Sequence, residues 1–299
     1  MAHTTRTMDT VQISRWVNYV ELAKVRLTTS VVISAGAGYL IGVEIVHWPT
    51  LFLLLAGGFL VVASSNAFNQ VIERYQDSQM ERTRNRPVAA GRTSPMEAMI
   101  FSTIIGIVGL VLLYTINPLS AGFGALSLFI YTSIYTPLKG RTPFAVFVGA
   151  IPGAIPFMLG WVAARNDFDI ESGTLFALQF IWQFPHFWAI AWILHEDYKK
   201  VGYHLLPTEE PNRKTATFIF VYTIWMILIS LAPATGFTGT LFLSMPAAAL
   251  VLIAGLWMLW KAYRLLVDVS VSGARALMLA SVAYLPLVQL IYVIDRWIP

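Results

Sequence analysis

The sequence predicts an all-α membrane protein with nine transmembrane helices. Of its 299 residues, 57% are hydrophobic and only 12% are charged, which is about half the charged share of a soluble domain. The apolar residues gather into blocks of about 20, the length of helix that crosses the hydrocarbon core of a bilayer. Because a helix satisfies its own backbone hydrogen bonds in lipid, each block is expected to be a helix. This composition excludes a soluble enzyme, a disordered scaffold and a nucleic-acid-binding module.

The nine blocks can be placed along the chain in order. They cover roughly 25–43, 48–72, 96–115, 119–138, 143–163, 173–194, 215–235, 240–260 and 275–294. We expect them to form a single membrane domain over residues 1–299. Its first part, 1–24, is expected to be a cytoplasmic segment, and the start of this segment lacks the apolar run of a signal peptide. The sequence has no cysteine, which excludes disulfides, zinc–thiolate sites and iron–sulfur clusters.

The lysine and arginine residues predict how the bundle is oriented. Eighteen of the 20 fall before the first block or near the connections that follow even-numbered blocks, and only Arg165 and Arg296 fall on the other side. Basic residues concentrate on the cytoplasmic side of membrane proteins. The N-terminus is therefore expected in the cytoplasm and the C-terminus outside, which agrees with an odd number of helices. The two long polar connections, 73–95 and 195–214, are then both cytoplasmic.

The second block ends in the most informative stretch of the chain, SSNAFNQVIERYQDSQMERTRNRP at 64–87. Asn69, Glu73 and Asp77 are spaced four residues apart, so a continuing helix places them on one face. Asn66 lies on nearly the same stripe. Carboxylate and amide oxygens suit a hard cation such as Mg²⁺. Polar residues that enter a membrane span are costly and usually face a functional cavity.

Basic residues follow this stripe directly. Arg82, Arg84 and Arg86 present guanidinium groups whose geometry fits phosphate oxygens. Acidic groups followed by a basic cluster indicate a metal-bridged diphosphate, in which the carboxylates hold the metal and the metal holds the phosphates. Taken alone, the arginines also fit a solvated cytoplasmic connection. The same two interpretations apply to Lys139 and Arg141 in TPLKGRTPF.

A second polar stretch reads QFIWQFPHFWAIAWILHEDYKKVGYHLLP at 179–207. Gln179, Gln183 and His186 share a helical face in this stretch. His186, set among aromatic residues, is a packing residue, a ligand to porphyrin iron or a proton shuttle. Beyond the block come acidic and basic residues that could form a second site, with Asp197 as a metal ligand and Lys199 or Lys200 near a leaving phosphate.

The run NQVIERYQDSQMERTRNRP resembles the NDxxDxxxD motif of the UbiA superfamily of intramembrane prenyltransferases. The resemblance covers essentially the whole chain and implies that family's bundle of nine helices with two polar cytoplasmic loops. TPLKGRTPF, QFPHFWAIA and DYKKVGYHLLP resemble the branch of the superfamily that farnesylates heme. Gln70 departs from the Asp or Asn of many relatives, and Glu73 from the Asp of many bacterial members.

The resemblance implies a role for each candidate residue. Mg²⁺ would be held by Asn69, Glu73, Asp77 and Asp197, which with Lys200 are the implied catalytic residues. The diphosphate would contact a set of basic residues, namely Arg82, Arg86, Lys139, Arg141, Lys199 and Lys200. His186 is the candidate contact to heme iron.

The implied reaction transfers a farnesyl group from farnesyl diphosphate to a vinyl group of heme B, with addition of water, and gives heme O and diphosphate. The implied surroundings are the lipid bilayer of a bacterial inner membrane, with heme A synthase or terminal-oxidase assembly as candidate partners. Three alternatives remain at this point. They are a prenyltransferase for a quinone precursor or chlorophyllide, a transporter with broken helices, and an inert assembly factor for cytochrome oxidase.

Overall fold

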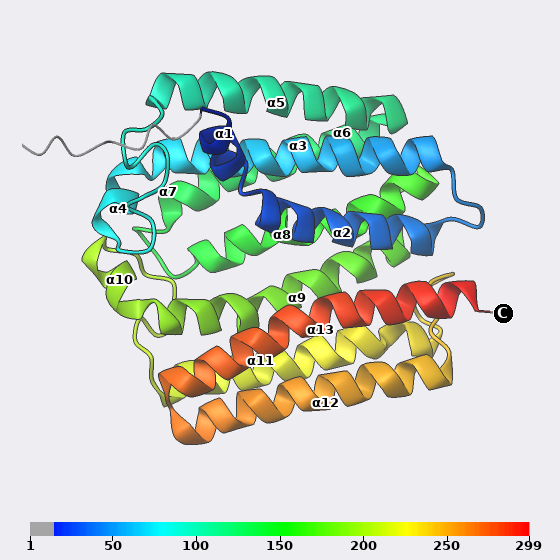
Figure 1. Ribbon diagram of the computed structural model, residues 1–299. Helices are drawn as coiled ribbons and strands as arrows, with labels where there is room; N and C mark the ends of the chain where they lie inside the picture. The colour runs from blue at the N-terminus through cyan, green and yellow to red at the C-terminus, as the bar shows by residue number, and fades with distance from the viewer. Residues whose placement is uncertain (1–14, 299) are drawn as a thin grey trace, which may run out of the picture.

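The computed structural model describes residues 15–298, which form a helical bundle without any strand (Figure 1). Of the predicted segment 1–24, residues 1–14 lie outside the described part, and most of the rest forms the first helix. The helices are, in chain order, α1 (Arg15–Ala23), α2 (Val25–Gly42), α3 (Trp48–Ile72), α4 (Arg74–Gln79), α5 (Pro95–Ile116), α6 (Pro118–Phe129), η1 (Ile130–Tyr135), α7 (Thr136–Leu138), α8 (Ala145–Arg165), α9 (Ile170–Ile193), α10 (His195–Lys200), α11 (Arg213–Leu231), η2 (Ala232–Thr235), α12 (Met245–Asp268) and α13 (Val271–Trp297).

Eight helices in the described part of the chain are long and apolar enough to cross a membrane. They are α2, α3, α5, the continuous run α6–η1–α7, α8, α11, α12 and α13. The sixth predicted block is present as α9, which is 24 residues long but is not among these eight. The protein is therefore a multi-pass membrane protein, and the count of nine spans stays a prediction.

One predicted boundary is wrong, and the reason is a helix cap. The sequence predicts the eighth block at 240–260, whereas α12 begins at Met245 and continues to Asp268. The side chain of Ser244 accepts a hydrogen bond from the Ala247 N–H and so caps the helix start. Lys261 and Arg264 consequently lie on the last turns of a helix rather than in a connection.

Helix α8 runs through the middle of the bundle, in contact with α2 and α9. Pro156 has no N–H to donate to the carbonyl of Pro152 one turn earlier. Ser127 of α6 lies 3.4 Å from that carbonyl oxygen and donates to it. A neighbouring helix thus satisfies the group that the proline frees, which is how membrane helices tolerate internal proline.

Small residues let α2 and α8 approach very closely. A Cβ atom added at Gly160 would lie 2.0 Å from the carbonyl oxygen of Ala35, and one added at Gly38 would lie 2.0 Å from the carbonyl oxygen of Phe157. Both obstacles are backbone atoms, which no side-chain movement can relieve. This is the close helix crossing that small residues permit in membranes.

Gly160→Ala should therefore destabilise the protein by at least about 1–3 kcal/mol, the usual cost of overpacking. The thermal unfolding midpoint of the detergent-solubilised protein measures this. Gly122→Ala in α6 is the matched control, because an added Cβ there meets no atom within 4 Å. An unchanged midpoint for Gly160→Ala would contradict the close crossing.

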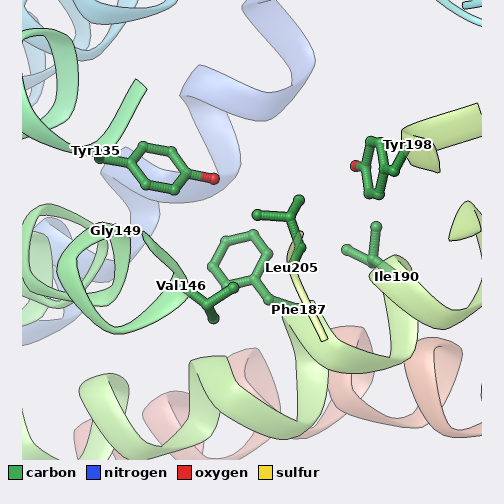
Figure 2. Close-up of a pocket in the computed structure, with 7 residues that line it drawn as sticks. All are labelled: Tyr135, Val146, Gly149, Phe187, Ile190, Tyr198 and Leu205. Atoms are coloured by element: carbon green, nitrogen blue, oxygen red, sulfur yellow. The ribbon is translucent and has the colours of Figure 1, made fainter. Parts of the chain in front are cut away.

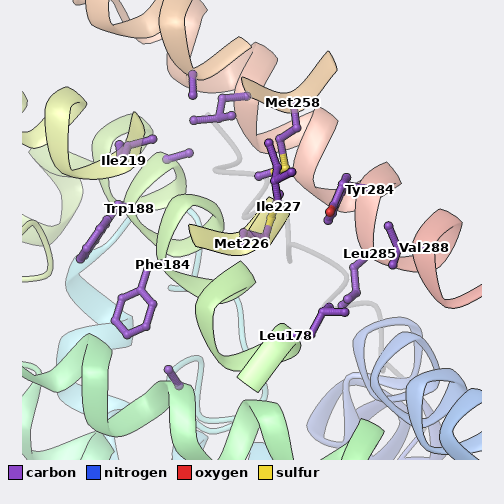
Figure 3. Close-up of a cluster of buried hydrophobic side chains, with 14 of the residues drawn as sticks. Leu178, Phe184, Trp188, Ile219, Met226, Ile227, Met258, Tyr284, Leu285 and Val288 are labelled. Carbon is purple, nitrogen blue, oxygen red and sulfur yellow. The ribbon is translucent and has the colours of Figure 1, made fainter. Parts of the chain in front are cut away.

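The larger apolar core lies among α9, α11, α12 and α13 (Figure 3). Aromatic and aliphatic side chains from these helices meet there, including Phe184 and Trp188 of α9, Met226 of α11 and Tyr284 of α13. The outward faces carry exposed apolar side chains such as Ile104. An apolar exterior around a packed interior is what a lipid environment requires.

The two ends of the bundle differ in how their charges are paired. In Figure 1, α1, α4, α7 and α10 gather at one end, while the α2–α3 connection and the C-terminus lie at the other. At this far end the carboxylates accept hydrogen bonds from backbone N–H groups rather than from lysine. Glu171 accepts from Thr240 at 2.6 Å, and Asp295 accepts from Ser244 at 2.8 Å.

Candidate active site

The acidic stripe lies where α3 gives way to α4. The helix is interrupted at Glu73, yet the Glu73 N–H donates to the Asn69 carbonyl at 2.9 Å and the Asp77 N–H to the Glu73 carbonyl at 2.8 Å. The four-residue repeat therefore continues across the interruption. Asn69, Glu73 and Asp77 are all buried, as the expected shared face requires.

Each carboxylate of the stripe is paired with a cation. Lys139 Nζ lies 2.8 Å from Glu73 Oε1, and Arg86 Nη1 lies 2.8 Å from both carboxylate oxygens of Asp77. Lys139 is itself buried. The structure thus brings together four of the residues that the sequence singles out, two candidate metal ligands and two candidate phosphate ligands.

Burial and pairing act in opposite directions on the pKa of Glu73. Burial raises the pKa, but the Lys139 ammonium and hydrogen bonds from Lys139, Asn69 and Tyr203 hold it below its ordinary value. For Lys139, burial lowers the pKa, while the attraction of Glu73 raises it well above its ordinary value. Both groups are therefore charged at neutral pH, and the pair is a true ion pair.

Lys24 is a member of this cluster that sequence reasoning counted only as an orienting charge. Burial lowers its pKa to about 7, helped by repulsion from Arg86 and Lys139 and opposed by Glu73 and Asp77. Lys24 is therefore within electrostatic reach of both ion pairs. Nothing in the sequence spacing links Lys24 to residues about 50 positions later, so only the fold reveals it.

Two amides of α3, Gln70 and Asn66, hold the α1–α2 junction. The amide of Gln70 donates to the carbonyl oxygens of Glu21 and Leu22 at 3.2 and 3.1 Å, in the last turn of α1, where carbonyls lack their usual helical partners. The amide of Asn66 donates to Thr28 Oγ1 at 3.2 Å. The amide at position 70 thus joins α3 to the end of α1.

The connection 195–214 begins with α10 and covers the acidic stripe with its middle part. Tyr203 lies beside Glu73 and under Lys139, whose Nζ is 5.9 Å from the centre of the tyrosine ring. The His204 N–H donates to the Lys139 carbonyl at 3.1 Å. Tyr203 lies in the DYKKVGYHLLP segment, but no spacing in the sequence links it to Glu73, so only the fold identifies it as a site residue. The two long connections do converge, through Tyr203 and Lys139.

Asp197 lies apart from the stripe. It pairs with Lys200 at 2.8 Å, three residues away on α10. Among residues 15–298, no three His, Asp or Glu side chains are close enough to share one metal ion, so Glu73, Asp77 and Asp197 do not form a single ligand set. The role of Asp197 as a metal ligand stays a prediction, as does that of Lys200 as a catalytic residue.

The remaining candidate phosphate ligands are on the surface. Arg82, Arg141 and Lys199 are exposed, and Lys199 Nζ is 4.0 Å from Glu210 Oε1. An exposed ion pair of this kind contributes little to stability. Their contact with a diphosphate stays a prediction.

A cavity of about 90 Å³, lined mainly by aliphatic and aromatic residues, lies next to the charged cluster. Figure 2 shows Tyr135 and Tyr198 on opposite sides, with Val146, Phe187 and Leu205 between them. The Tyr135 ring connects the two regions, because Lys139 Nζ is 4.6 Å from its centre. Gly149 also lines the cavity, and a Cβ there would lie 2.6 Å from the Tyr135 ring. A residue with a side chain at position 149 would therefore collide with the Tyr135 ring in this position.

His186 and the two glutamines bond to different neighbouring helices. Gln179 and Gln183 each donate to α8, at the carbonyls of Gly153 and Ala150, both at 2.8 Å. His186 instead contacts Ser281 of α13. The three positions lie within about 60° of one another around an ideal helix, so they share one broad face from which the side chains reach different partners.

The contacts of His186 fix its tautomer. Its Nδ1 lies 2.7 Å from Ser281 Oγ, and that hydroxyl donates its proton to the Met278 carbonyl at 2.6 Å. Ser281 must then accept from His186 Nδ1–H, which leaves the lone pair on Nε2. The imidazole stacks on Trp182, with 4.7 Å between ring centres.

A helical membrane bundle with ion-paired carboxylates at one end, beside an apolar cavity, defines an integral-membrane enzyme for amphiphilic substrates. A model of the UbiA prenyltransferase family matches residues 31–284. The chain belongs to the UbiA prenyltransferase family.

Several proteins are similar to this chain over nearly its whole length. A protoheme IX farnesyltransferase of Flavobacterium johnsoniae is 53% identical over 288 residues, which is 95% of this chain and 96% of that one. The mitochondrial protoheme IX farnesyltransferase of Homo sapiens is 34% identical over 90% of this chain and 60% of its own. In structure, a digeranylgeranylglyceryl phosphate synthase gives a TM-score of 0.78 at 21% identity, covering 94% of this chain and 98% of its own. A UbiA homologue from Archaeoglobus fulgidus bound to GPP and Mg²⁺ gives 0.68 at 14% identity, covering 92% and 99%.

Proposed function

We propose that this protein transfers the farnesyl group of farnesyl diphosphate to a vinyl group of heme B and so makes heme O. The observation that carries the proposal is the 53% identity to a protoheme IX farnesyltransferase over 95% of the chain. The site supports it independently. A charged cluster beside an apolar cavity suits a substrate that has a diphosphate at one end and a hydrocarbon at the other.

The donor atoms of the acidic stripe fit Mg²⁺. Asn69, Glu73 and Asp77 supply hard oxygen ligands, and Mg²⁺ is commonly bound by one or two carboxylates together with substrate phosphates. When bound, the ion would neutralise charge on the diphosphate oxygens and make that group a better leaving group. Arg86 and Lys139, now paired with the carboxylates, would be free to turn to the diphosphate once a metal ion takes over the carboxylate charge.

The chain's own residues would then govern three steps. The allylic C–O bond of the donor breaks heterolytically, with the electron pair leaving on diphosphate near Arg86 and Lys139. The vinyl group attacks the allylic cation, forming the C–C bond, and water captures the resulting cation and releases one proton. The aromatic lining of the cavity, with Tyr135 at its charged end, would exclude stray water until the C–C bond has formed.

We propose that the charged end of the bundle faces the cytoplasm of a bacterial cell. The basic residues gathered near that end support this orientation, because lysine and arginine are retained on the cytoplasmic side. Both substrates would then enter where α4 and α10 lie. Diphosphate would be released to the cytoplasm, and product would be passed to an acceptor for heme O.

The direct test is a product assay on the detergent-purified protein with heme B, farnesyl diphosphate and Mg²⁺. Mass spectrometry should detect heme that has gained one farnesyl group and one water, and EDTA should abolish it. A protein that binds heme but forms no product would point to a carrier. A protein that binds no heme but releases diphosphate with another acceptor would assign a different prenyl acceptor.

His186 is proposed to contact the heme iron through Nε2, the nitrogen that its bond to Ser281 leaves available. His186→Ala should then change the Soret spectrum of bound heme, since the iron loses an axial ligand. His47→Ala, at the far end of α3, is the matched control. An unchanged Soret band in His186→Ala would assign the histidine to packing against Trp182.

A further inference from the structure

We propose that the hydroxyl groups of Tyr135 and Tyr198 hold the water molecule that is added to the farnesylated product. The proposal rests on the proposed function and assigns its hydration step to two residues. The cation formed on the acceptor has two possible fates, because it can bind water or lose a proton and become an alkene. A water molecule held in place beside that cation favours the first fate.

The two hydroxyls are the polar side-chain groups of the cavity beside the charged cluster. Of the seven residues that line it, Tyr135 and Tyr198 alone carry a polar side-chain atom. Figure 2 shows their hydroxyls pointing toward each other across the cavity. The cavity volume of about 90 Å³ exceeds the roughly 10–15 Å³ that one water needs. Two facing hydroxyls among hydrocarbon side chains thus provide a place for a single water molecule.

Neither hydroxyl bonds to a protein group within residues 15–298. Tyrosine O–H groups inside a protein usually find a partner, and elsewhere in this bundle they do. The Tyr284 hydroxyl donates to Ser230 Oγ at 2.9 Å, and the Tyr39 hydroxyl to the His47 carbonyl at 3.2 Å. Two hydroxyls that face each other without a protein partner indicate a small polar ligand between them.

The two rings lie at the boundary between the charged cluster and the cavity. Lys139 Nζ is 4.6 Å from the centre of the Tyr135 ring. The Tyr198 ring centre is 6.0 Å from that of Tyr203, the tyrosine beside Glu73. In the prenyl donor the allylic carbon is bonded directly to a diphosphate oxygen, so a diphosphate at the charged cluster brings the reacting carbons to this boundary. The hydroxyls are therefore close to where water must be added.

Each tyrosine comes from a different part of the chain. Tyr135 ends η1, a turn of π-helix in which the Thr136 N–H donates to the carbonyl of Tyr131, five residues earlier. Such turns are frequent at functional sites. Tyr198 lies on α10, at the start of the connection 195–214. The pair is therefore complete only when this connection is folded over the end of the bundle.

A water molecule held between two phenols keeps the groups that the reaction uses. A phenol can donate or accept a hydrogen bond, so one tyrosine can donate to the water while the other accepts from it. One lone pair and one proton of the water then remain free. The lone pair forms the C–O bond to the cationic carbon beside the porphyrin ring, and the free proton passes to the diphosphate that has just left. No oxidant or reductant is required.

The test is the composition of the product that full-length variants form in detergent from heme B, farnesyl diphosphate and Mg²⁺. Tyr135→Phe and Tyr198→Phe each remove one oxygen atom and keep the ring. Mass spectrometry separates farnesylated heme that carries the added water from the alkene, which is lighter by one water. We expect the alkene's share of the product to rise about tenfold in each variant, because one of the two hydrogen bonds that hold the water is lost.

Tyr222→Phe is the matched control. Tyr222 packs against Phe184, with 4.8 Å between ring centres, and is not a lining residue of this cavity, so its variant should leave the composition unchanged. Wild-type composition in both Tyr135→Phe and Tyr198→Phe would overturn the proposal, even if the rate fell. An equal rise of the alkene in the control would also overturn it. A wild-type protein that attaches no farnesyl group to heme would instead refute the proposed function, and this assignment would fall with it.

Discussion

Asp77→Asn is expected to lower product formation by about 10²–10³-fold, the usual loss when one preorganised electrostatic contact is removed from an active site. Asparagine keeps the size of the side chain but loses the charge that pairs with Arg86 and that would hold Mg²⁺. The measurement is the single-turnover rate of heme O formation, followed by mass spectrometry. Raised Mg²⁺ should restore only part of the rate, because an amide binds a hard cation less tightly than a carboxylate.

Glu81→Gln is the control for this change. Glu81 lies four residues further along the same connection and is exposed, so its neutralisation should leave the rate within a factor of two or so of wild type, as for most surface changes. Equal rates for Asp77→Asn and wild type would remove the acidic stripe from the mechanism. Equal losses in both variants would indicate a general electrostatic effect of the connection instead.

Lys139→Met should destabilise the fold by about 3–5 kcal/mol, the cost of leaving one member of a buried ion pair without its partner. Glu73 is buried, and Lys139 is the cation 2.8 Å from it. The double variant Glu73→Gln/Lys139→Met should recover much of the lost stability, because it leaves no unpaired charge buried at this position. The unfolding midpoint in detergent, measured for both single variants and the double, gives the coupling.

Arg141→Met provides the comparison, since Arg141 is exposed two residues away and should cost under about 0.5 kcal/mol. Additive losses in the double variant would show that Glu73 and Lys139 do not stabilise each other. The stability test is independent of the catalytic one, because it needs neither heme nor farnesyl diphosphate.

Much of the fold and half of the site could be predicted because they depend on local spacing. Apolar blocks of about 20 residues locate the helices, since burial in lipid acts on the whole length of a block. The alignment of Asn69, Glu73 and Asp77 follows from four-residue spacing along one helix. The wrong detail, the start of α12, depends on a helix cap at Ser244.

The rest of the site depends on tertiary pairing, which one sequence does not reveal. Lys24 and Lys139 look alike in the chain, as two lysines near the ends of apolar blocks. Lys139 acquires its partner because the run α6–η1–α7 delivers it to Glu73, and Lys24 acquires its place because Gln70 ties α1 to α3. Tyr203 likewise becomes a site residue only when its connection folds over the stripe.

The backbone-bonded carboxylates of the far end have a consequence for how the protein is made. Glu171 and Asp295 accept hydrogen bonds from Thr240 and Ser244, so neither carboxylate needs a lysine or arginine as its partner. Under the proposed orientation the loops of this end cross the bilayer during biogenesis, and they can stay almost free of basic residues, which would otherwise hold them back. Membrane insertion and catalysis would then depend on the same charged residues. The cations that would bind the diphosphate would also help to retain their end of the bundle on the cytoplasmic side.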